Sequence, residues 1–339
     1  MDDGLPARLT RLTRRLLDPG GAPARTVEHV LRDLQGLWSS APPAGRPGAS
    51  PGGVAEVTDF GANPGRLRML RYVPAVPPRA GAPVLVLLHG CGQDAGSFAR
   101  ASGFAALADR LGAPLLLPDQ RAENNPGRCF NWFEPAKIRR GAGEAASIHA
   151  MVAATLATFR GDPRRVFVAG LSAGAAMTAA LLVAYPDVFA GGAVVAGLPV
   201  GVATDVGSAL ARMRAAGGGS RADLVARAAP ARAGGIAWPH MPRLSVWHGG
   251  ADSTVDPANA DALVAQWTGL LGLPEAPDRE EDIAPGVRRL AWGQGVEQWR
   301  LAGFGHAFPA ALPGADPFVL PAPVGGAEAI ARFWGLLPA

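Results

Sequence analysis

Short apolar runs alternate with helix-length segments from residue 55 to near the end of the chain. Apolar runs without a helical period are typical of strands that are buried on both faces. They predict a strand pair over 55–74 and further strands at 84–88, 115–117, 165–169, 192–196, 244–247 and 297–302. Helices are expected between them, near 97–111 and 144–159, over 173–185 and from Pro257 onward. Strands that alternate with helices predict a doubly wound, mostly parallel α/β sheet with helices on both faces.

Residues 1–53, which precede this pattern, differ from it in periodicity and composition. Within residues 1–38 four leucines share one helical face and the arginines lie mostly off it, and a second short helix is expected from Thr26. Residues 39–53 have the Pro, Gly and Ser content of a linker. We therefore predict a helical extension (1–38), a linker (39–53) and a catalytic domain (54–339), in which the Gly-rich segment 201–240 is either a cap or a surface insertion. The basic N-terminal helix is expected to pack on its own domain, and weak contact with a granule or membrane surface is the alternative.

Composition and charge narrow the function classes. The formal net charge is +4 and the pI is near 9.8, yet arginine is scattered and no zinc-finger or RNA-binding pattern occurs, so nucleic acid is not an expected partner. No run reaches the roughly 20 apolar residues of a membrane helix. Acidic residues open the chain and no apolar leader follows Arg14-Arg15, so a cytoplasmic location is predicted, or secretion if a leader has been removed. The sequence does not predict an oligomeric state.

The chain has two cysteines, Cys91 and Cys129. Two cysteines are too few for a disulfide framework, and their spacing does not suit a metal site. Free thiols are expected, unless folding brings the two backbones together. No metal or other cofactor is predicted.

One stretch combines a strand, a sharp turn and a helix around a single serine. Residues 170–174 read GLSAG, which fits G-x-S-x-G, between the apolar run 165–169 and the alanine-rich segment 173–185. In this context the motif is a nucleophile elbow, a strained turn that holds the serine hydroxyl clear of the sheet. Because the motif alone arises by chance in Gly-rich chains, its place between strand and helix is what makes Ser172 a candidate nucleophile.

A serine hydroxyl is a poor nucleophile unless a base takes its proton. His306 is the best candidate because it lies on a glycine-flanked loop after the last long strand. The other histidines are expected to be structural or superficial, namely His29, His89, His149, His240 and His248. Asp252 follows the strand at 244–247 and is expected to orient the base, whereas the runner-up, Asp256, is placed to cap the next helix. The order Ser172, Asp252, His306 is the chain order of α/β-hydrolases.

The remaining candidates surround this predicted triad. The segment HGCGQ (89–93) follows the first buried strand, so the amides of Cys91 and Ala173 are predicted to form an oxyanion hole. The aromatic stretch 130–133 either lines an acyl pocket or packs beneath its loop, and both interpretations stay open.

Several blocks together resemble a known family. They are LLHGCGQDAGSFA, NPGRCFNWFEP, RGAGEAASIHAMV, the elbow block from Asp162 to Pro199, WHGGADSTVDPAN and GFGHAFP. Over roughly residues 54–338 the chain resembles the polyhydroxybutyrate depolymerase-like esterases, which have the α/β-hydrolase fold. The resemblance implies a serine esterase that acts on polyesters or oligoesters of short hydroxy acids, with Ser172, Asp252 and His306 as the catalytic set and Cys91 and Ala173 as oxyanion donors.

Departures from the family pattern fall near the expected pocket. Val200 and Val202 stand where an aromatic residue and a cysteine are common, and Phe308 where tryptophan is usual. The pocket candidates are Trp132, Phe130 and Phe308. Feruloyl or acetyl esters, thioesters and peptides are alternative substrates for the same machinery. A hydrolase fold that binds a ligand without catalysis is the alternative from another class.

Overall fold

A single large sheet organises the molecule. The computed structural model describes residues 52–231 and 241–338. Its strands are β1 (Gly53–Val57), β2 (Arg68–Val73), β3 (Val84–Leu88), β4 (Leu115–Asp119), β5 (Val166–Leu171), β6 (Gly191–Val195), β7 (Arg243–Gly249), β8 (Arg279–Ala284), β9 (Val287–Trp292) and β10 (Val296–Leu301). They are ordered β1-β2-β4-β3-β5-β6-β7-β10-β9-β8. The strands from β4 to β10 in this order are parallel, and antiparallel pairs flank them on both sides, so the predicted mostly parallel sheet is confirmed.

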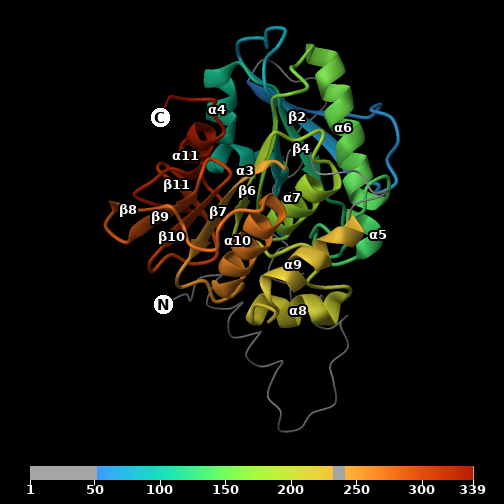
Figure 1. Ribbon diagram of the computed structural model, residues 1–339. Coiled ribbons are helices and arrows are strands. Elements are labelled where there is room, and N and C mark those ends of the chain that lie inside the picture. The colour runs from blue at the N-terminus through green and yellow to red at the C-terminus, as the bar shows by residue number, and fades with distance from the viewer. Residues whose placement is uncertain (1–51, 232–240, 339) are drawn as a thin grey trace, which may run out of the picture.

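Helices cover both faces of this sheet (Figure 1). Helices α6 (Gly143–Phe159), α7 (Ala173–Ala184) and α10 (Ala258–Leu271) contribute to the core on one face. Helices α3 (Ala95–Ala101), α4 (Phe104–Leu111) and α11 (Gly326–Phe333) contribute to the core on the other. Strand β3 supplies alternate side chains to the two cores, because successive residues of a strand point to opposite faces. Both faces are therefore buried, which explains why the central strands are apolar without alternation.

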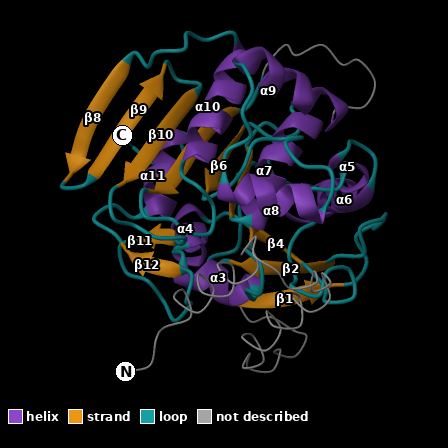
Figure 2. Ribbon diagram, turned by 90° about the horizontal axis from the view of Figure 1, so that it is seen from below, coloured by secondary structure: helices purple, strands orange, loops and turns teal. Residues whose placement is uncertain are grey.

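Shorter elements lie around the sheet. Helices α8 (Val206–Arg214) and α9 (Arg221–Ala228) occupy one end of the sheet, in the lower part of Figure 1, and α8 lies toward the viewer in Figure 2. A 3-10 turn (Ala229–Ala231) follows α9, and α5 (Pro135–Ile138) precedes α6. Strands β11 (Phe308–Ala310) and β12 (Val319–Pro321) form a separate two-stranded parallel sheet.

The structure departs from the predicted elements at several places. The helix expected near 97–111 is divided into α3 and α4, because Gly103 adopts a left-handed conformation with φ 85°. The hairpin β8–β9 was not predicted, since the edge strand β8 reads REEDIA and exposes most of its side chains. Within 201–240, the segment predicted to be a cap or a surface insertion, the chain forms α8 and α9, and residues 232–240 lie outside the described residues.

The predicted N-terminal extension (1–38) and most of the linker (39–53) also lie outside the described residues.

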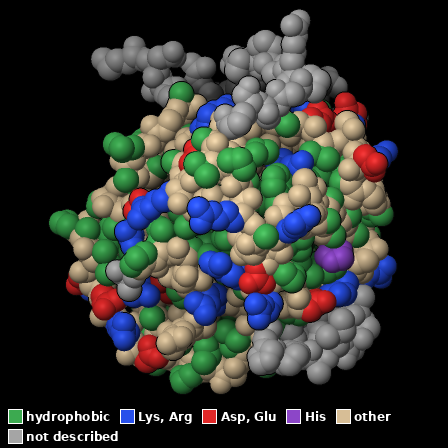
Figure 3. Space-filling model, turned by 90° about the horizontal axis from the view of Figure 1, so that it is seen from above, with side chains coloured by type: hydrophobic (Ala, Val, Ile, Leu, Met, Phe, Trp, Pro, Cys, Tyr) green, Lys and Arg blue, Asp and Glu red, His purple; other side chains and the backbone are tan. Residues whose placement is uncertain are grey.

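Basic side chains spread over the face seen in Figure 3, with acidic and apolar side chains among them, as expected for a solvated arginine-rich surface. Among the described helices, none is long and apolar enough to cross a membrane.

Candidate active site

Ser172 occupies the turn between β5 and α7. Its backbone has φ 56° and ψ −119°, a conformation that costs a residue with a side chain free energy. The Ser172 amide donates to the Val195 carbonyl at 2.9 Å, and the Ser172 carbonyl accepts from the Ala176 amide at 3.0 Å. Both backbone groups of the residue are thus paired, and the surrounding structure holds the turn in its strained form.

The two glycines of the motif are required by close contacts. A Cβ atom on Gly170 would lie 2.4 Å from the Gly174 carbonyl, and one on Gly174 would lie 2.4 Å from the Leu88 carbonyl oxygen. These distances are shorter than any contact that a carbon atom tolerates. The elbow therefore depends on helix α7 passing directly over the ends of β5 and β3.

The predicted acid and base lie in contact. β7 and β10 are parallel neighbours, so the loops that follow them leave the sheet at the same edge. These loops bring Nδ1 of His306 to 2.8 Å from Oδ2 of Asp252. Oδ1 of the same carboxylate accepts from the amides of Thr254 and Val255, each at 2.9 Å. A carboxylate held in this way fixes the imidazole tautomer with its proton on Nδ1, which leaves Nε2 to act as a base.

A second histidine contacts the same carboxylate. Nε2 of His248 lies 3.2 Å from Oδ2 of Asp252 and 3.0 Å from the Val255 carbonyl oxygen. Burial raises the pKa of the Asp252 carboxyl, but hydrogen bonds with His248 and His306, together with the Val255 amide, outweigh it and hold the pKa well below its ordinary range. The sequence predicted a structural or superficial role for His248 and did not predict this contact, although the four-residue spacing to Asp252 is visible in it.

The other candidates have separate structural contacts. Asp256 accepts from the Ala258 amide at 2.9 Å at the start of α10, where Pro257 is the N-cap residue. His89 is fully buried, with Nδ1 2.7 Å from the Gly90 carbonyl oxygen. His149 stacks on Tyr185 with ring centroids 4.5 Å apart. His29 and His240 lie outside the described residues.

The Cys91 amide, in the loop after β3, is left unpaired. The Gly90 amide donates to Oε1 of Gln93 at 2.6 Å, the Gly92 amide to the Gly127 carbonyl at 2.9 Å and the Gln93 amide to the Gly90 carbonyl at 3.3 Å. The Cys91 amide has no hydrogen-bond partner among the described residues. A Cβ atom on Gly90 would lie 3.4 Å from Cβ of Ser172, so this loop runs beside the serine. Ala173 opens α7, and its amide therefore has no partner within the helix.

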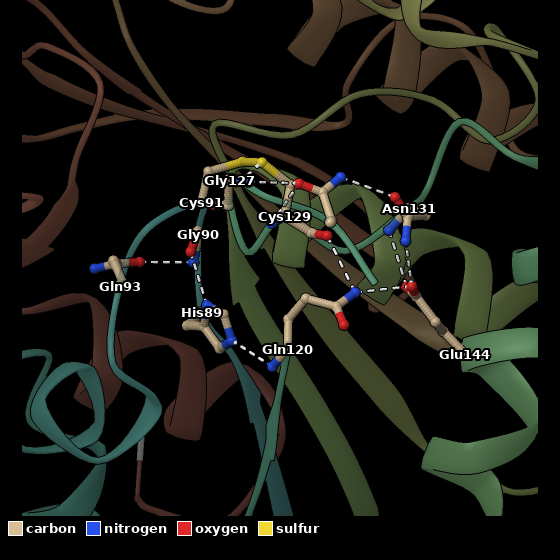
Figure 4. The surroundings of a disulfide bond; sticks show 10 residues. His89, Gly90, Cys91, Gln93, Gln120, Gly127, Cys129, Asn131 and Glu144 are labelled. Carbon is tan, nitrogen blue, oxygen red and sulfur yellow. Dashed lines mark hydrogen bonds between the residues drawn. A yellow bond between two sulfur atoms is a disulfide. The ribbon is translucent and has the colours of Figure 1, made fainter. Parts of the chain in front are cut away.

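The two cysteines form a disulfide, so the expectation of free thiols is wrong. Their sulfur atoms are 2.09 Å apart across a sequence separation of 38 residues. The bond joins the loop after β3 to the loop 120–134, and Figure 4 shows the Gly127 and Cys129 side of this junction beside Cys91. The Cα atoms approach to 4.2 Å because the second loop crosses back over the first, a path that the sequence does not indicate.

A pocket of about 340 Å³ contains both Ser172 and His306. Cys91, Trp132 and Phe133 also line it, together with residues of α8 and the loop residue Phe318. The α8 residues are Val206, Ala209, Leu210 and Met213. A larger and more open pocket of about 1010 Å³ lies between α10 and the β9–β10 region, but it contains neither Ser172 nor His306, so the smaller one is the candidate active site.

Two of the predicted pocket residues lie elsewhere. Phe130 is fully buried in the core against His89, with ring centroids 5.0 Å apart. Phe308 is fully buried between Phe98 and Phe104 on the other side of the sheet. Neither side chain lines the pocket. Of the three candidates, Trp132 alone lines it, with its neighbours Asn131 and Phe133.

Comparison with known proteins agrees with this geometry. The family model described as Esterase PHB depolymerase matches residues 68–282. The chain belongs to this family. Over 262 residues it is 42% identical to the poly(3-hydroxyalkanoate) depolymerase C of Paucimonas lemoignei, a match that covers 76% of this chain and 62% of that protein. It is 31% identical to the acetylxylan esterase A of Aspergillus oryzae, over 75% of this chain and 84% of that protein.

A solved structure supports the same fold for this esterase domain. The acetyl xylan esterase from Aspergillus awamori aligns with a TM-score of 0.73 at 24% identity, over 84% of this chain and all of that one. The match with depolymerase C spans less than two thirds of that relative. Family membership therefore describes the ester-hydrolase domain, and the substrate of the whole protein is a separate question.

A buried acid supports the pocket wall of this domain. Glu144 is fully buried and accepts from the Asn131 amide at 2.9 Å, from Nδ2 of Asn131 at 2.6 Å and from Nε2 of Gln120 at 2.8 Å (Figure 4). Burial raises the pKa of the Glu144 carboxyl, and the hydrogen bonds offset part of that effect. Asn131 lies in the pocket lining, so Glu144 fixes the wall without reaching the pocket itself. Among the described residues no group of three or more metal-ligating side chains comes together.

Proposed function

We propose that the protein is a serine carboxylic-ester hydrolase that works through an acyl-enzyme. One observation carries the proposal: the hydrogen-bonded pair Asp252–His306 and the strained serine Ser172 come from different strands and meet at one pocket. The identity to a poly(3-hydroxyalkanoate) depolymerase and to an acetylxylan esterase supports the ester as the bond that is cleaved.

The first half of the reaction acylates the serine. Oγ of Ser172 attacks the ester carbonyl carbon, and Nε2 of His306 takes the hydroxyl proton. Asp252 holds the imidazole and stabilises the imidazolium that forms. The amides of Cys91 and Ala173 donate to the oxygen that becomes negative, and the intermediate expels the alcohol, which takes the proton from His306.

The second half returns the free enzyme. Water gives a proton to His306 and attacks the acyl carbon, and the same two amides stabilise the second oxyanion. The carboxylic acid leaves, and Ser172 regains its proton. Loss of one oxyanion donor lowers kcat by about a hundred- to a thousandfold in such sites.

We propose a polyester or oligoester of short hydroxy acids as the substrate. The relative at 42% identity is named for poly(3-hydroxyalkanoate), and the pocket wall formed by α8 and Trp132 is apolar, which suits short alkyl side groups. Feruloyl or acetyl esters are the second candidate. The edge-to-face pair of Trp132 and Phe133, with centroids 5.8 Å apart, offers an aromatic surface, and relatives at 30% and 31% identity are named feruloyl and acetylxylan esterases.

The disulfide bears on where the protein works. Disulfides persist in oxidising compartments and are rare in a reducing cytosol. The Cys91–Cys129 bond therefore favours secretion, the alternative kept in the sequence analysis, over the predicted cytoplasmic location. Contact of the N-terminal helix with a granule or membrane remains a prediction, since residues 1–38 lie outside the described part.

Hydrolysis of p-nitrophenyl butyrate tests the proposed reaction. Ser172→Ala is expected to lower kcat by several orders of magnitude, because alanine has no hydroxyl that could form the acyl-enzyme. Ser97→Ala, which removes a hydroxyl from α3 outside the pocket, serves as the control. Equal rates for wild type and Ser172→Ala would contradict a serine hydrolase. A panel of hydroxybutyrate oligomers, feruloyl esters and acetyl esters then ranks the substrate classes by kcat/KM.

A further inference from the structure

The candidate active-site pocket has few charged side chains in its lining. Twenty residues line it, and none of them is lysine or arginine. Its one carboxylate belongs to Glu134. A second carboxylate lies behind the lining, because Asp316 accepts from Nε2 of the lining residue Gln93 at 3.0 and 3.1 Å. Apart from His306, the described lining residues therefore offer no side chain that could neutralise an anion.

The backbone of Glu134 is held firmly beside the pocket. Its amide donates to the Asn131 carbonyl at 3.1 Å, and Asn131 is bound to the buried Glu144. Its carbonyl accepts from the Lys137 amide at 2.8 Å at the start of α5. The disulfide between Cys129 and Cys91 joins the same loop to the loop after β3, which carries the Cys91 amide. Figure 4 shows this support, with Cys129 and Asn131 on the loop that leads to Glu134.

The Glu134 carboxylate has no structural partner that would explain its charge. It makes no side-chain hydrogen bond to the start of α5, although it occupies the N-cap position. In the described part of the chain no ion pair joins it to Lys137 or to any arginine. A half-buried, unpaired carboxylate on a fixed backbone that lines the pocket is a charge that acts on whatever enters the pocket.

We propose that Glu134 is a specificity-determining residue that selects uncharged ester segments and disfavours esters that carry a carboxylate near the scissile bond. The inference rests on the proposed esterase function. In a polyester of hydroxy acids the one charged group is the carboxylate at the chain end. Glu134 therefore directs cleavage to internal ester bonds, away from the acid terminus, and it repels the acid product after each turnover.

The expected size of the effect follows from charge repulsion that solvent screens. Two carboxylates in one partly solvated pocket repel by an amount that corresponds to about a three- to tenfold change in kcat/KM at low ionic strength. Added salt reduces the effect, because both groups are reached by solvent.

The test uses two substrates of equal length. These are p-nitrophenyl pentanoate and the p-nitrophenyl monoester of pentanedioic acid, which differ by a terminal carboxylate. The readout is the ratio of kcat/KM for the uncharged ester over the charged ester, with Ser172→Ala protein as the blank for spontaneous hydrolysis. Glu134→Gln should lower this ratio by about three- to tenfold, and Glu134→Lys should lower it further.

The matched control is Glu123→Gln, which removes an equal charge from the same loop at an exposed position outside the pocket. It should keep the wild-type ratio. Equal ratios in wild type, Glu134→Gln and Glu134→Lys would overturn the role of Glu134 and leave the esterase function intact. Failure of the wild type to exceed the Ser172→Ala blank on either ester would overturn both.

Discussion

Two buried carboxylates support the site from different sides, and their pKa values are shifted in opposite directions. Asp252 has a pKa held well below its ordinary range, whereas the pKa of Glu144 is raised. Each accepts at least three hydrogen bonds, but the donors to Glu144 are neutral amides. Asp252 also faces the imidazoles of His248 and His306. The number of hydrogen bonds therefore does not fix the direction of the pKa shift: burial dominates for Glu144, whereas the contacts with the two imidazoles outweigh burial for Asp252.

The largest expected effect comes from replacing the Asp252 carboxylate with its isosteric amide. Asp252→Asn is expected to lower kcat by about 10⁴-fold, because an amide no longer fixes the His306 tautomer or stabilises its imidazolium. The thermal midpoint should change little by comparison. Hydrolysis of p-nitrophenyl butyrate measures the loss, and Asp256→Asn, four residues on, is the matched control. A loss below tenfold would place the orienting acid elsewhere.

The next largest expected effect is on the free energy of unfolding, through the disulfide in the loop that Glu144 also supports. The disulfide closes a loop of 38 residues around the wall that Glu144 also supports. Replacing both Cys91 and Cys129 with alanine is expected to lower the free energy of unfolding by about 2–4 kcal/mol. Denaturant titration of the double variant beside wild type, both without reductant, measures it. An unchanged midpoint would mean that the buried hydrogen bonds alone hold the loop.

The same contrast explains what the sequence could predict. The elbow was predictable because its signal is local: GLSAG lies between a strand and a helix that each have a clear pattern. The Asp252–His306 pair followed from chain order once the parallel sheet was recognised. The disulfide, the His248 contact and the Glu144 network were not predictable, because each depends on the path of a loop between regular elements. Phe308 was misplaced for a related reason, since β11 lies outside the main sheet.

A smaller effect is expected at Glu144 itself. Glu144→Gln should destabilise the fold by about 1–3 kcal/mol, because the new amide group turns a donor toward a donor in a buried site. The change in kcat should stay below about tenfold, since Glu144 supports Asn131 and does not touch the reacting groups. Denaturant titration and p-nitrophenyl butyrate turnover, measured on one preparation, separate the two quantities. A loss of kcat comparable with that of Asp252→Asn would mean that Glu144 matters for catalysis as much as Asp252 does. It would contradict a role for Glu144 that is limited to supporting Asn131.

The smallest effect is a pH dependence whose sign differs between the two acids. The pKa of Glu144 is raised above its ordinary value of 4.5 in the folded protein, so the folded state binds more protons than the unfolded state above that pH. The stability of wild type relative to Glu144→Gln should therefore fall as the pH rises from 4.5 through the raised pKa. Asp252 has the opposite sign, because its contribution is present above its ordinary value of 3.8 and is lost as the pH falls. Unfolding free energies of wild type and Glu144→Gln between about pH 4.5 and 8 isolate the Glu144 contribution, since Asp252 is common to both proteins and is ionised there in both states. A difference that is flat or rises with pH would mean that Glu144 is held ionised like Asp252, and that neutral donors suffice to keep a buried carboxylate charged.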